Sequence, residues 1–368
     1  MPIPEQRDLE AARGDIRDWL AKKVPERTDL TISELSGPAF TGFSNETLLF
    51  DAIWTEDGEE RREGLVLRVE PTRHHLFLDP DFEIQYKVID TLGRRSDVPV
   101  APMRWYEDDA SILGAAFFVM SKVEGRVPQD SPPYTQEGWL LEESTPEERR
   151  RLVLSGIEAL AKVHAVDWRA LGFGFLDKDQ YGPAGLEQQL NYYEAYLRWA
   201  MDGAPNPVAD AALDWLRANK PEEQELALVW GDARINNQIF DDHTVAAVVD
   251  WEMVTLADPM MDVGWWLFLD RHFHEGMPAD RLEGFPTREE MVEHYEQVSG
   301  RTTHDLRYYE VLAGLKFTII MARLTGLLVE FEILPVENDM GLNNIPSRLT
   351  AALLGLPSPG PEPVPIVD

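Results

Sequence analysis

The chain has 368 residues, 44% of them hydrophobic, which is enough for about two domains or lobes with apolar cores of their own. Acidic residues outnumber basic ones 66 to 34, a formal charge of −32 without a basic stripe, and this balance argues against nucleic-acid and anionic-membrane partners. The absence of cysteine excludes a disulfide framework and thiol chemistry.

The first part of the chain is predicted to be rich in strands. The N-terminus is charged throughout, so no signal peptide is expected, and residues 8–24 have apolar positions at helical spacing. A second helix is predicted at 80–92. Strands are predicted at 30–37, 46–54, 64–70 and 115–123.

Helical patterns dominate after residues 124–134, a linker-like stretch rich in proline and polar residues. One helix start is clearly marked, because Thr145 can cap it, Pro146 takes the first helical position and Glu148 completes a capping box. Further helices are predicted at 186–201, 208–219, 288–298 and 305–330.

The outline is therefore α+β, with a β-rich N-lobe at 1–120, a mainly helical C-lobe at 121–355 and a proline-rich tail at 356–368. Ligand sites favour the cleft between two such lobes. The apolar segment 305–330 contains Lys316, so it is predicted to be a buried helix rather than a membrane span. We expect a cytoplasmic protein without a membrane partner.

The segment LVWGDARINNQIFDD has the most informative polar pattern. Asp232 ends an apolar run, Asn237 follows it by five residues, and a later short apolar strand ends in Asp250. If 238–241 and 245–250 fold as a hairpin, Asp250 returns beside the loop that holds Asp232 and Asn237. Carboxylate and amide oxygens are hard ligands that suit Mg²⁺, and a carboxylate outside the metal can orient or deprotonate a hydroxyl group.

The WGDARINN segment followed by VVDWEMVTLADPMMDVGW resembles the aminoglycoside phosphotransferase family, whose signature is His-Gly-Asp-x-x-x-x-Asn and then Asp-Trp-Glu. The resemblance implies a two-lobed, protein-kinase-like fold. It also implies that Asp232 is the catalytic base, that Asn237 and Asp250 bind Mg²⁺, and that Asp262 supports the catalytic loop. The pattern LVLRVEP…VLAGLKF is similar to the kinase domains found with acyl-CoA dehydrogenases.

Trp230 stands where this family usually has histidine. Indole offers one N–H donor and no acceptor, so its role is limited to packing or a single donated hydrogen bond. A purely structural interpretation is the alternative for the whole pattern: Asp232 as a turn residue, Asn237 as a structural amide and Asp250 as the cap of a strand end.

The segment SGPAFTGFSNETL provides a loop with two glycines between two strands. Glycines let the backbone approach phosphates and expose N–H groups to them, although a lone loop of this kind is also compatible with a simple turn. The resemblance implies that the loop binds nucleotide through Gly37, Gly42, Ser44 and Asn45.

In the strand GLVLRVE, alternation places Arg68 on the face opposite Leu65 and Leu67. Arg68 falls where kinases carry the lysine that binds the α- and β-phosphates, and the alternative is an edge residue in water. The usual partner of that cation lies on the next helix. Gln85 matches its position and Glu83 is about 200° around the helix, so both cannot face the cleft and the partner stays open.

The segment FFVMSKVEG resembles the strand that crosses between kinase lobes. The resemblance implies that backbone groups near Met120 and Ser121 bind adenine and that Val119 lines its pocket. A buried strand is equally compatible with these letters.

The leading hypothesis is a kinase that uses ATP and Mg²⁺ to phosphorylate a hydroxyl group of a small molecule. Family membership suggests an aminoglycoside-like acceptor, and the acidic composition would favour a cationic one. The similarity to kinases found with acyl-CoA dehydrogenases points instead to a hydroxyacyl-CoA. A non-catalytic nucleotide-binding protein is the alternative that Trp230 and Gln85 motivate. The sequence leaves open the acceptor, the choice between ATP and GTP, and the oligomeric state.

Overall fold

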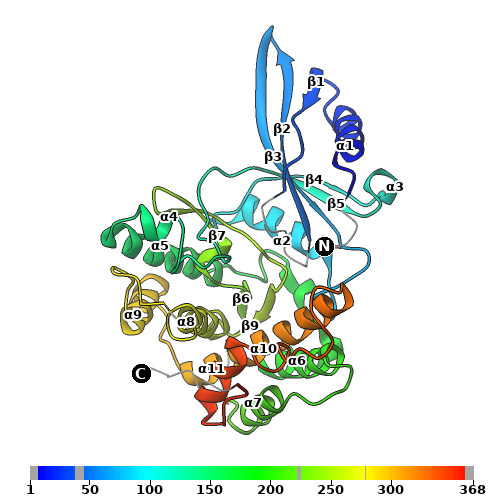
Figure 1. Cartoon of the computed structure of the whole chain (residues 1–368). Coiled ribbons are helices and arrows are strands. Elements are labelled where there is room, and N and C mark those ends of the chain that lie inside the picture. Colours follow the sequence, from blue (N-terminus) through cyan, green and yellow to red (C-terminus); the bar gives the residue numbers. More distant parts are fainter. Residues whose placement is uncertain (1–6, 38–44, 222–224, 278, 361–368) are drawn as a thin grey trace.

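The computed structural model describes residues 7–37, 45–221, 225–277 and 279–360. An antiparallel five-stranded sheet of order β1-β2-β3-β5-β4 lies with helix α1 (Leu9–Lys23) in the upper part of Figure 1, and helices fill the lower part. The predicted α+β class, a β-rich N-lobe with a mainly helical C-lobe, is confirmed. The strands are β1 (Thr28–Ile32), β2 (Glu46–Glu56), β3 (Glu59–Val69), β4 (Met103–Glu107) and β5 (Phe117–Ser121).

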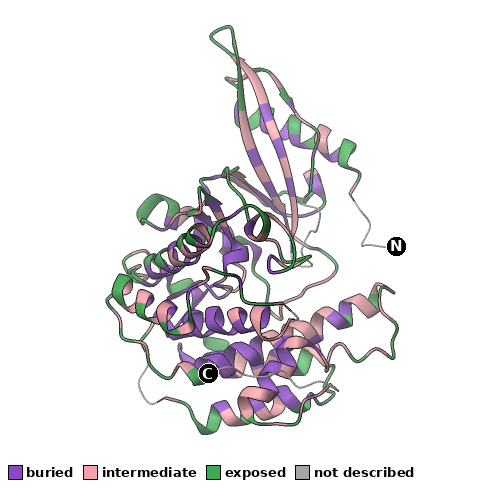
Figure 2. Ribbon diagram, turned by 60° about the vertical axis from the view of Figure 1, so that its left-hand side comes forward, coloured by how far each residue is buried: buried purple, intermediate pink, exposed green. Residues whose placement is uncertain are grey.

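The two faces of this sheet are different because apolar and polar side chains alternate along β3. Leu65, Leu67 and Val69 are buried in a cluster that also contains Trp19 and Leu20 of α1. The alternation is visible as bands of buried and partly buried residues along the β2–β3 hairpin (Figure 2). The opposite face, with Arg68, is turned toward the C-lobe side.

Helix α2 (Phe82–Arg95) follows the sheet in sequence but shares the larger core of the C-lobe. Val88 and Leu92 are fully buried in that cluster. At the end of α2, Arg95 Nη2 donates to the carbonyl of Ala170 at 2.8 Å. The core of the C-lobe therefore extends beneath the sheet.

The C-lobe is a helical assembly around α10 (Leu306–Glu330). The predicted capping box at the start of α5 is confirmed, with Glu148 N donating to Thr145 Oγ1 at 3.3 Å. By length and composition α10 could cross a membrane, but 61% of its most apolar window is buried inside the protein, as predicted for a core helix. The other helices are α3 (Ala110–Leu113), α4 (Trp139–Glu142), α5 (Pro146–His164), α6 (Leu186–Ala200), α7 (Pro207–Ala218), α8 (Met260–His274), α9 (Arg288–Ser299) and α11 (Ile345–Leu354).

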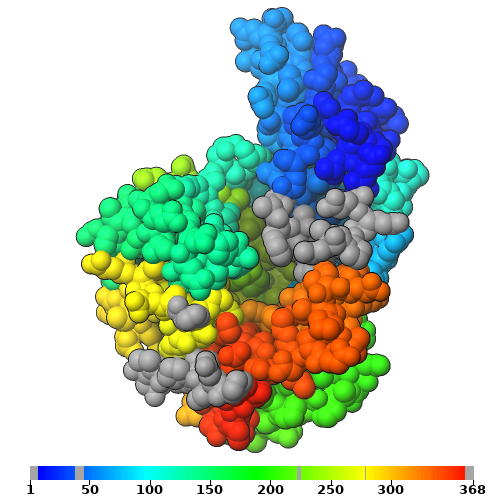
Figure 3. All heavy atoms as spheres, in the orientation of Figure 1, coloured from blue at the N-terminus to red at the C-terminus, as the bar shows by residue number. Residues whose placement is uncertain are grey.

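Two small antiparallel ladders position the segments that form the candidate site. β6 (Ala227–Val229) pairs with β9 (Thr255–Ala257), and the predicted hairpin is confirmed as β7 (Gln238–Asp241) against β8 (Thr244–Val248). These ladders lie at the back of a hollow between the lobes, which α10 and the segment around α4 flank in the space-filling view (Figure 3).

Candidate active site

The predicted catalytic loop, residues 230–237, begins directly after β6, and Asp262 of α8 anchors it through hydrogen bonds. The Asp262 carboxylate accepts hydrogen bonds from the N–H groups of Trp230 at 2.7 Å and Gly231 at 2.8 Å, and from His164 Nε2 at 3.1 Å. Gly231 has a φ of 94°, and a Cβ there would overlap the carbonyl oxygen of Met253. Glycine is thus required where the two segments touch.

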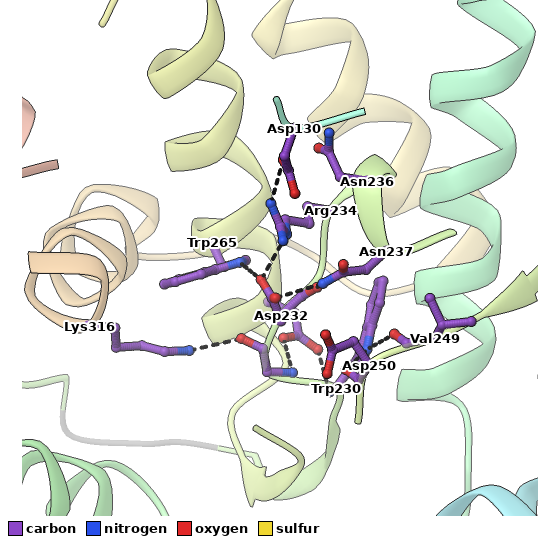
Figure 4. Close-up of polar contacts among 12 residues, drawn as sticks. Asp130, Trp230, Asp232, Arg234, Asn236, Asn237, Val249, Asp250, Trp265 and Lys316 are labelled. Carbon is purple, nitrogen blue, oxygen red and sulfur yellow. Dashed lines mark hydrogen bonds and ion pairs between the residues drawn. The ribbon is translucent and has the colours of Figure 1, made fainter. Parts of the chain in front are cut away.

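Asp232 is held in one orientation by side chains on three sides. Oδ1 accepts from Trp265 Nε1 at 2.9 Å, and Oδ2 accepts from Asn237 Nδ2 at 2.6 Å (Figure 4). The guanidinium Nε of Arg234 lies 3.3 Å from Oδ1, and the Asp232 side chain is 14% exposed. The carboxylate is preorganised yet still reaches solvent, as a group that meets a ligand must.

Asp250 returns beside this loop, as the predicted hairpin requires. Its backbone has a φ of 63°, and its buried Oδ1 has no hydrogen-bond partner. Burial raises the pKa of Asp250, and the charge of Asp232 raises it further, whereas Arg68 and Arg234 oppose the shift. Asn237 donates through its nitrogen to Asp232, which leaves its amide oxygen for a ligand.

These two residues fit a magnesium site. An unbonded carboxylate oxygen and an amide oxygen are hard ligands, and Mg²⁺ usually takes only one or two protein oxygens together with phosphates and water. Among the described residues, no group of three or more His, Asp or Glu forms a metal cluster, so an all-protein cage does not fit. The donor set suits a metal shared with a polyphosphate.

The predicted nucleotide side of the site is the face of the sheet that carries Arg68. Arg68 pairs across the ladder with Phe118, so both side chains share one face, and the Nε of Arg68 has no hydrogen-bond partner. The predicted role of Val119 does not fit, because Val119 pairs with Leu67 and is fully buried on the opposite face.

The prediction for the crossing strand also needs correction at Ser121. The Ser121 N–H already donates to the carbonyl of Pro102 at 2.9 Å, and its Oγ accepts from Arg104 Nε at 2.9 Å. This amide is therefore not available to adenine. Met120 is half-buried and its side chain lies on the Arg68 face, but its backbone pairs with Val66 of β3. The bonds from Lys122 N to Gly64 O and from Glu70 N to Ala116 O place this pair at a hydrogen-bonded position of the ladder, so the Met120 backbone is also engaged.

Of the predicted nucleotide loop, Gly42 and Ser44 lie outside the described residues, and Gly37 is exposed beside the bridge between Ser36 and Leu49. Asn45 is buried, and its Nδ2 donates to Glu252 Oε2 at 3.3 Å and to Gln85 Oε1 at 3.5 Å. Asn45 thus links the sheet to α2 and to the segment after Asp250.

The choice between Gln85 and Glu83 is decided by the orientation of α2. Gln85 is buried and faces Asn45, whereas Glu83 is exposed and pairs with Lys87 at 2.7 Å. Gln85 and Glu252 also line a small pocket, partly open to solvent, beside Asn45. Gln85 therefore faces the site, although its partner is Asn45 and not Arg68.

Three further residues brace the catalytic loop and were missed from the sequence. Arg234 Nη1 donates to Asp130 Oδ1 at 2.8 Å, and so connects the proline-rich stretch 124–134 to Asp232. Trp265 is the donor to Asp232 described above. Lys316 Nζ donates to the Gly231 carbonyl at 3.1 Å and lies 4.5 Å from the Trp265 ring centroid. Of these three residues, only Arg234 could have been found from the sequence, because it lies two residues after Asp232.

A sequence model of the phosphotransferase enzyme family, APH, matches residues 42–298 of the chain. The chain belongs to this family. The chain also resembles a putative aminoglycoside phosphotransferase from Ralstonia eutropha, with a TM-score of 0.65, 25% identity and coverage of 92% of this chain and 95% of that one. A complex of a thermostable mutant of aminoglycoside phosphotransferase APH(4)-Ia with ADP and hygromycin B shares the fold, at a TM-score of 0.52 and 16% identity over 95% of this chain and 99% of that one. The predicted protein-kinase-like fold is confirmed.

The curated relatives that the chain matches are longer proteins. It is 30% identical over 256 residues to "Probable acyl-CoA dehydrogenase IBR3" of Arabidopsis thaliana, covering 64% of this chain and 30% of the relative. It is 34% identical over 201 residues to "Acyl-CoA dehydrogenase family member 11" of Gallus gallus, covering 53% and 23%. The chain thus spans less than a third of these relatives, and the predicted similarity to this subgroup is confirmed.

Proposed function

We propose that the chain is an ATP- and Mg²⁺-dependent phosphotransferase that phosphorylates a hydroxyl group of a small molecule. The observation that supports this proposal is the arrangement of Asp232, Asn237 and Asp250: one fixed carboxylate beside an amide oxygen and an unbonded carboxylate oxygen. Membership of a phosphotransferase family supports it, and so does the ADP bound to APH(4)-Ia.

In this proposal Asp232 accepts the proton of the acceptor hydroxyl. The hydroxyl oxygen forms a bond to the γ-phosphorus as the bond from that phosphorus to the β,γ-bridging oxygen breaks, leaving ADP. Mg²⁺, held by Asn237 and Asp250, would neutralise charge on the phosphate oxygens. Arg68 binds phosphate oxygens from the sheet side, since guanidinium makes bidentate contacts with them.

Two acceptor classes compete. The fold neighbours named as aminoglycoside phosphotransferases favour a cationic amino sugar, which the net charge of −32 would attract. The relatives named as acyl-CoA dehydrogenases favour a hydroxyacyl-CoA, because a kinase in the same chain would act on a related thioester. A nucleotide-binding protein without catalysis is less well supported, since Asp232 keeps the orientation that proton transfer requires.

Mass spectrometry of an acceptor panel would test the proposal. Aminoglycosides, amino alcohols and hydroxyacyl-CoAs would be incubated with the protein and Mg·ATP, with Asp232→Asn alongside. We expect one class to gain a phosphate with the wild type and not with the variant. ATP binding without any product across the panel would favour the nucleotide-binding alternative, and no binding of ATP would contradict the proposal.

A further inference from the structure

Trp230 occupies the position at which the family signature has histidine, and its indole reaches the segment that holds Asp250. The ring is fully buried, with its centroid 6.1 Å from that of Trp251. Its Nε1 donates to two main-chain carbonyls, at 3.1 Å to Val249 and 2.9 Å to Asp250 (Figure 4). The indole therefore bonds directly to the backbone of the proposed metal ligand.

Asp250 is a residue whose conformation depends on such contacts. Its φ of 63° lies in the left-handed region, which aspartate adopts more readily than most residues with a Cβ but still at a cost in free energy. The Asp250 carboxylate has one backbone hydrogen bond, from Glu252, whereas its Oδ1 has no partner. If the carbonyl were released, a return of φ to negative values would displace the carboxylate.

The main chain of Trp230 is itself fixed, so the indole can transmit position. Trp230 N donates to Asp262 Oδ2 at 2.7 Å, and Asp262 in turn lies on the buried helix α8. One rigid side chain with two torsions thus joins the catalytic loop to the segment of Asp250.

We propose that Trp230 is a positioning residue for the metal site: its N–H keeps the Asp250 backbone in the left-handed conformation and so holds the carboxylate in place beside the loop of Asp232 and Asn237. This inference rests on the proposed function, in which Asp250 and Asn237 bind Mg²⁺. An indole N–H does not titrate, so the link holds at the same strength at pH 6 and pH 8, whereas an imidazole would change charge across this range.

Calorimetric titration with ADP at increasing Mg²⁺ concentrations tests the inference without requiring turnover. Trp230→Phe keeps a ring but removes the N–H, and we expect the Mg²⁺ concentration for half-maximal binding to rise about tenfold, as for the loss of one buried hydrogen bond. ADP affinity without metal should not change. Trp230→His restores a ring donor and is expected to recover part of the loss.

Trp168→Phe is the matched control, because it removes an indole N–H that donates to the Leu226 carbonyl at 3.0 Å, away from the site. It should leave the metal dependence unaltered. A wild-type metal dependence in Trp230→Phe would overturn the inference, and so would equal losses in Trp230→Phe and Trp230→His, since ring volume would then explain both. A wild-type protein that binds no ADP at any Mg²⁺ concentration would instead overturn the proposed function on which the inference rests.

Discussion

Asp232 and Arg68, which lie on the two sides of the candidate site, differ in how completely their polar groups are bonded within the protein. On the C-lobe side, both oxygens of Asp232 accept hydrogen bonds, at 2.9 and 2.6 Å. On the sheet side, the Nε of Arg68 has no partner among the described residues, and the contact of Asn45 with Gln85 is a long 3.5 Å. The catalytic loop is thus preorganised, whereas the sheet side keeps a donor available for a polyanion.

The largest expected effect comes from the most strongly bonded residue. Asp232→Asn removes the proton acceptor but nearly keeps the side-chain volume, so we expect turnover to fall by about 10²–10⁴ with Mg·ATP affinity nearly intact. Single-turnover phosphate transfer and calorimetry would measure the two quantities. Asp242→Asn, at an exposed turn of the neighbouring hairpin, is the control. Unchanged turnover in Asp232→Asn would contradict the assignment of Asp232 as the base.

Arg68 tests the other side of the comparison. Arg68→Met should weaken ADP binding by about 10- to 100-fold, because a charged donor to phosphate contributes about 1.5–3 kcal/mol. The pKa of Asp250 should also rise further, since Arg68 opposes its upward shift, and metal-dependent binding should then fail at a higher pH on acidification. Arg62→Met, an exposed position on the same strand, is the control. Unchanged binding would assign Arg68 to Asp250 alone.

Lys316 extends the test to the interior behind the catalytic loop. Burial lowers the pKa of its ammonium group from 10.5 to about 8. Between these values the unfolded chain binds the proton more tightly, so the cost of the buried charge is fully present below pH 8 and disappears as the pH rises toward 10.5. The free energy of unfolding should therefore gain about 2 kcal/mol from pH 8 to pH 10 through this group.

Urea unfolding at pH 8, 9 and 10 would measure that gain. Lys316→Met should lack it, while Lys162→Met, at an exposed position on α5, should keep it. The same pH dependence in the wild type and in Lys316→Met would show that the ammonium is not the group responsible.

The smallest effects concern α2. Gln85→Ala removes the acceptor of Asn45, and we expect ADP affinity to fall a few-fold, equivalent to about 1 kcal/mol. Glu83→Ala breaks only an exposed ion pair with Lys87 and should change the free energy of unfolding by less than about 0.5 kcal/mol, with no change in affinity. If Glu83→Ala had the greater effect on affinity, the orientation of α2 described above would be wrong.

The parts of the site that local patterns determine were predictable. The alternation in β3 placed Arg68 opposite Leu67, and the turn between β7 and β8 brought Asp250 back to Asp232. These features depend on side-chain period and on short-range pairing, which a sequence displays directly.

The errors arose where register or distant contacts decide. Val119 was predicted to line the adenine pocket, but its pairing with Leu67 in the ladder of β3 and β5 puts it on the buried face, and its own neighbours do not determine that pairing. Trp265 is 33 residues from Asp232, and Lys316 is 85 residues from the carbonyl it bonds, so neither contact leaves a local pattern. The three-residue strand β9 was also missed, since it is too short for periodicity to show.

Helix α2 also determines where the molecule divides into folding units. Its buried residues belong to the core of the C-lobe, and Arg95 donates to the Ala170 carbonyl. In the segment after α2, the Pro99 carbonyl accepts a hydrogen bond from Val248 N at 2.7 Å. We therefore expect α2 to unfold with the C-lobe and not with β1–β3, which precede it in the same predicted lobe. In dilute urea, the amide hydrogens of α2 should exchange with solvent at the same rate as those of α5 and α10. The amide hydrogens of β1–β3 should exchange earlier, as a separate unit.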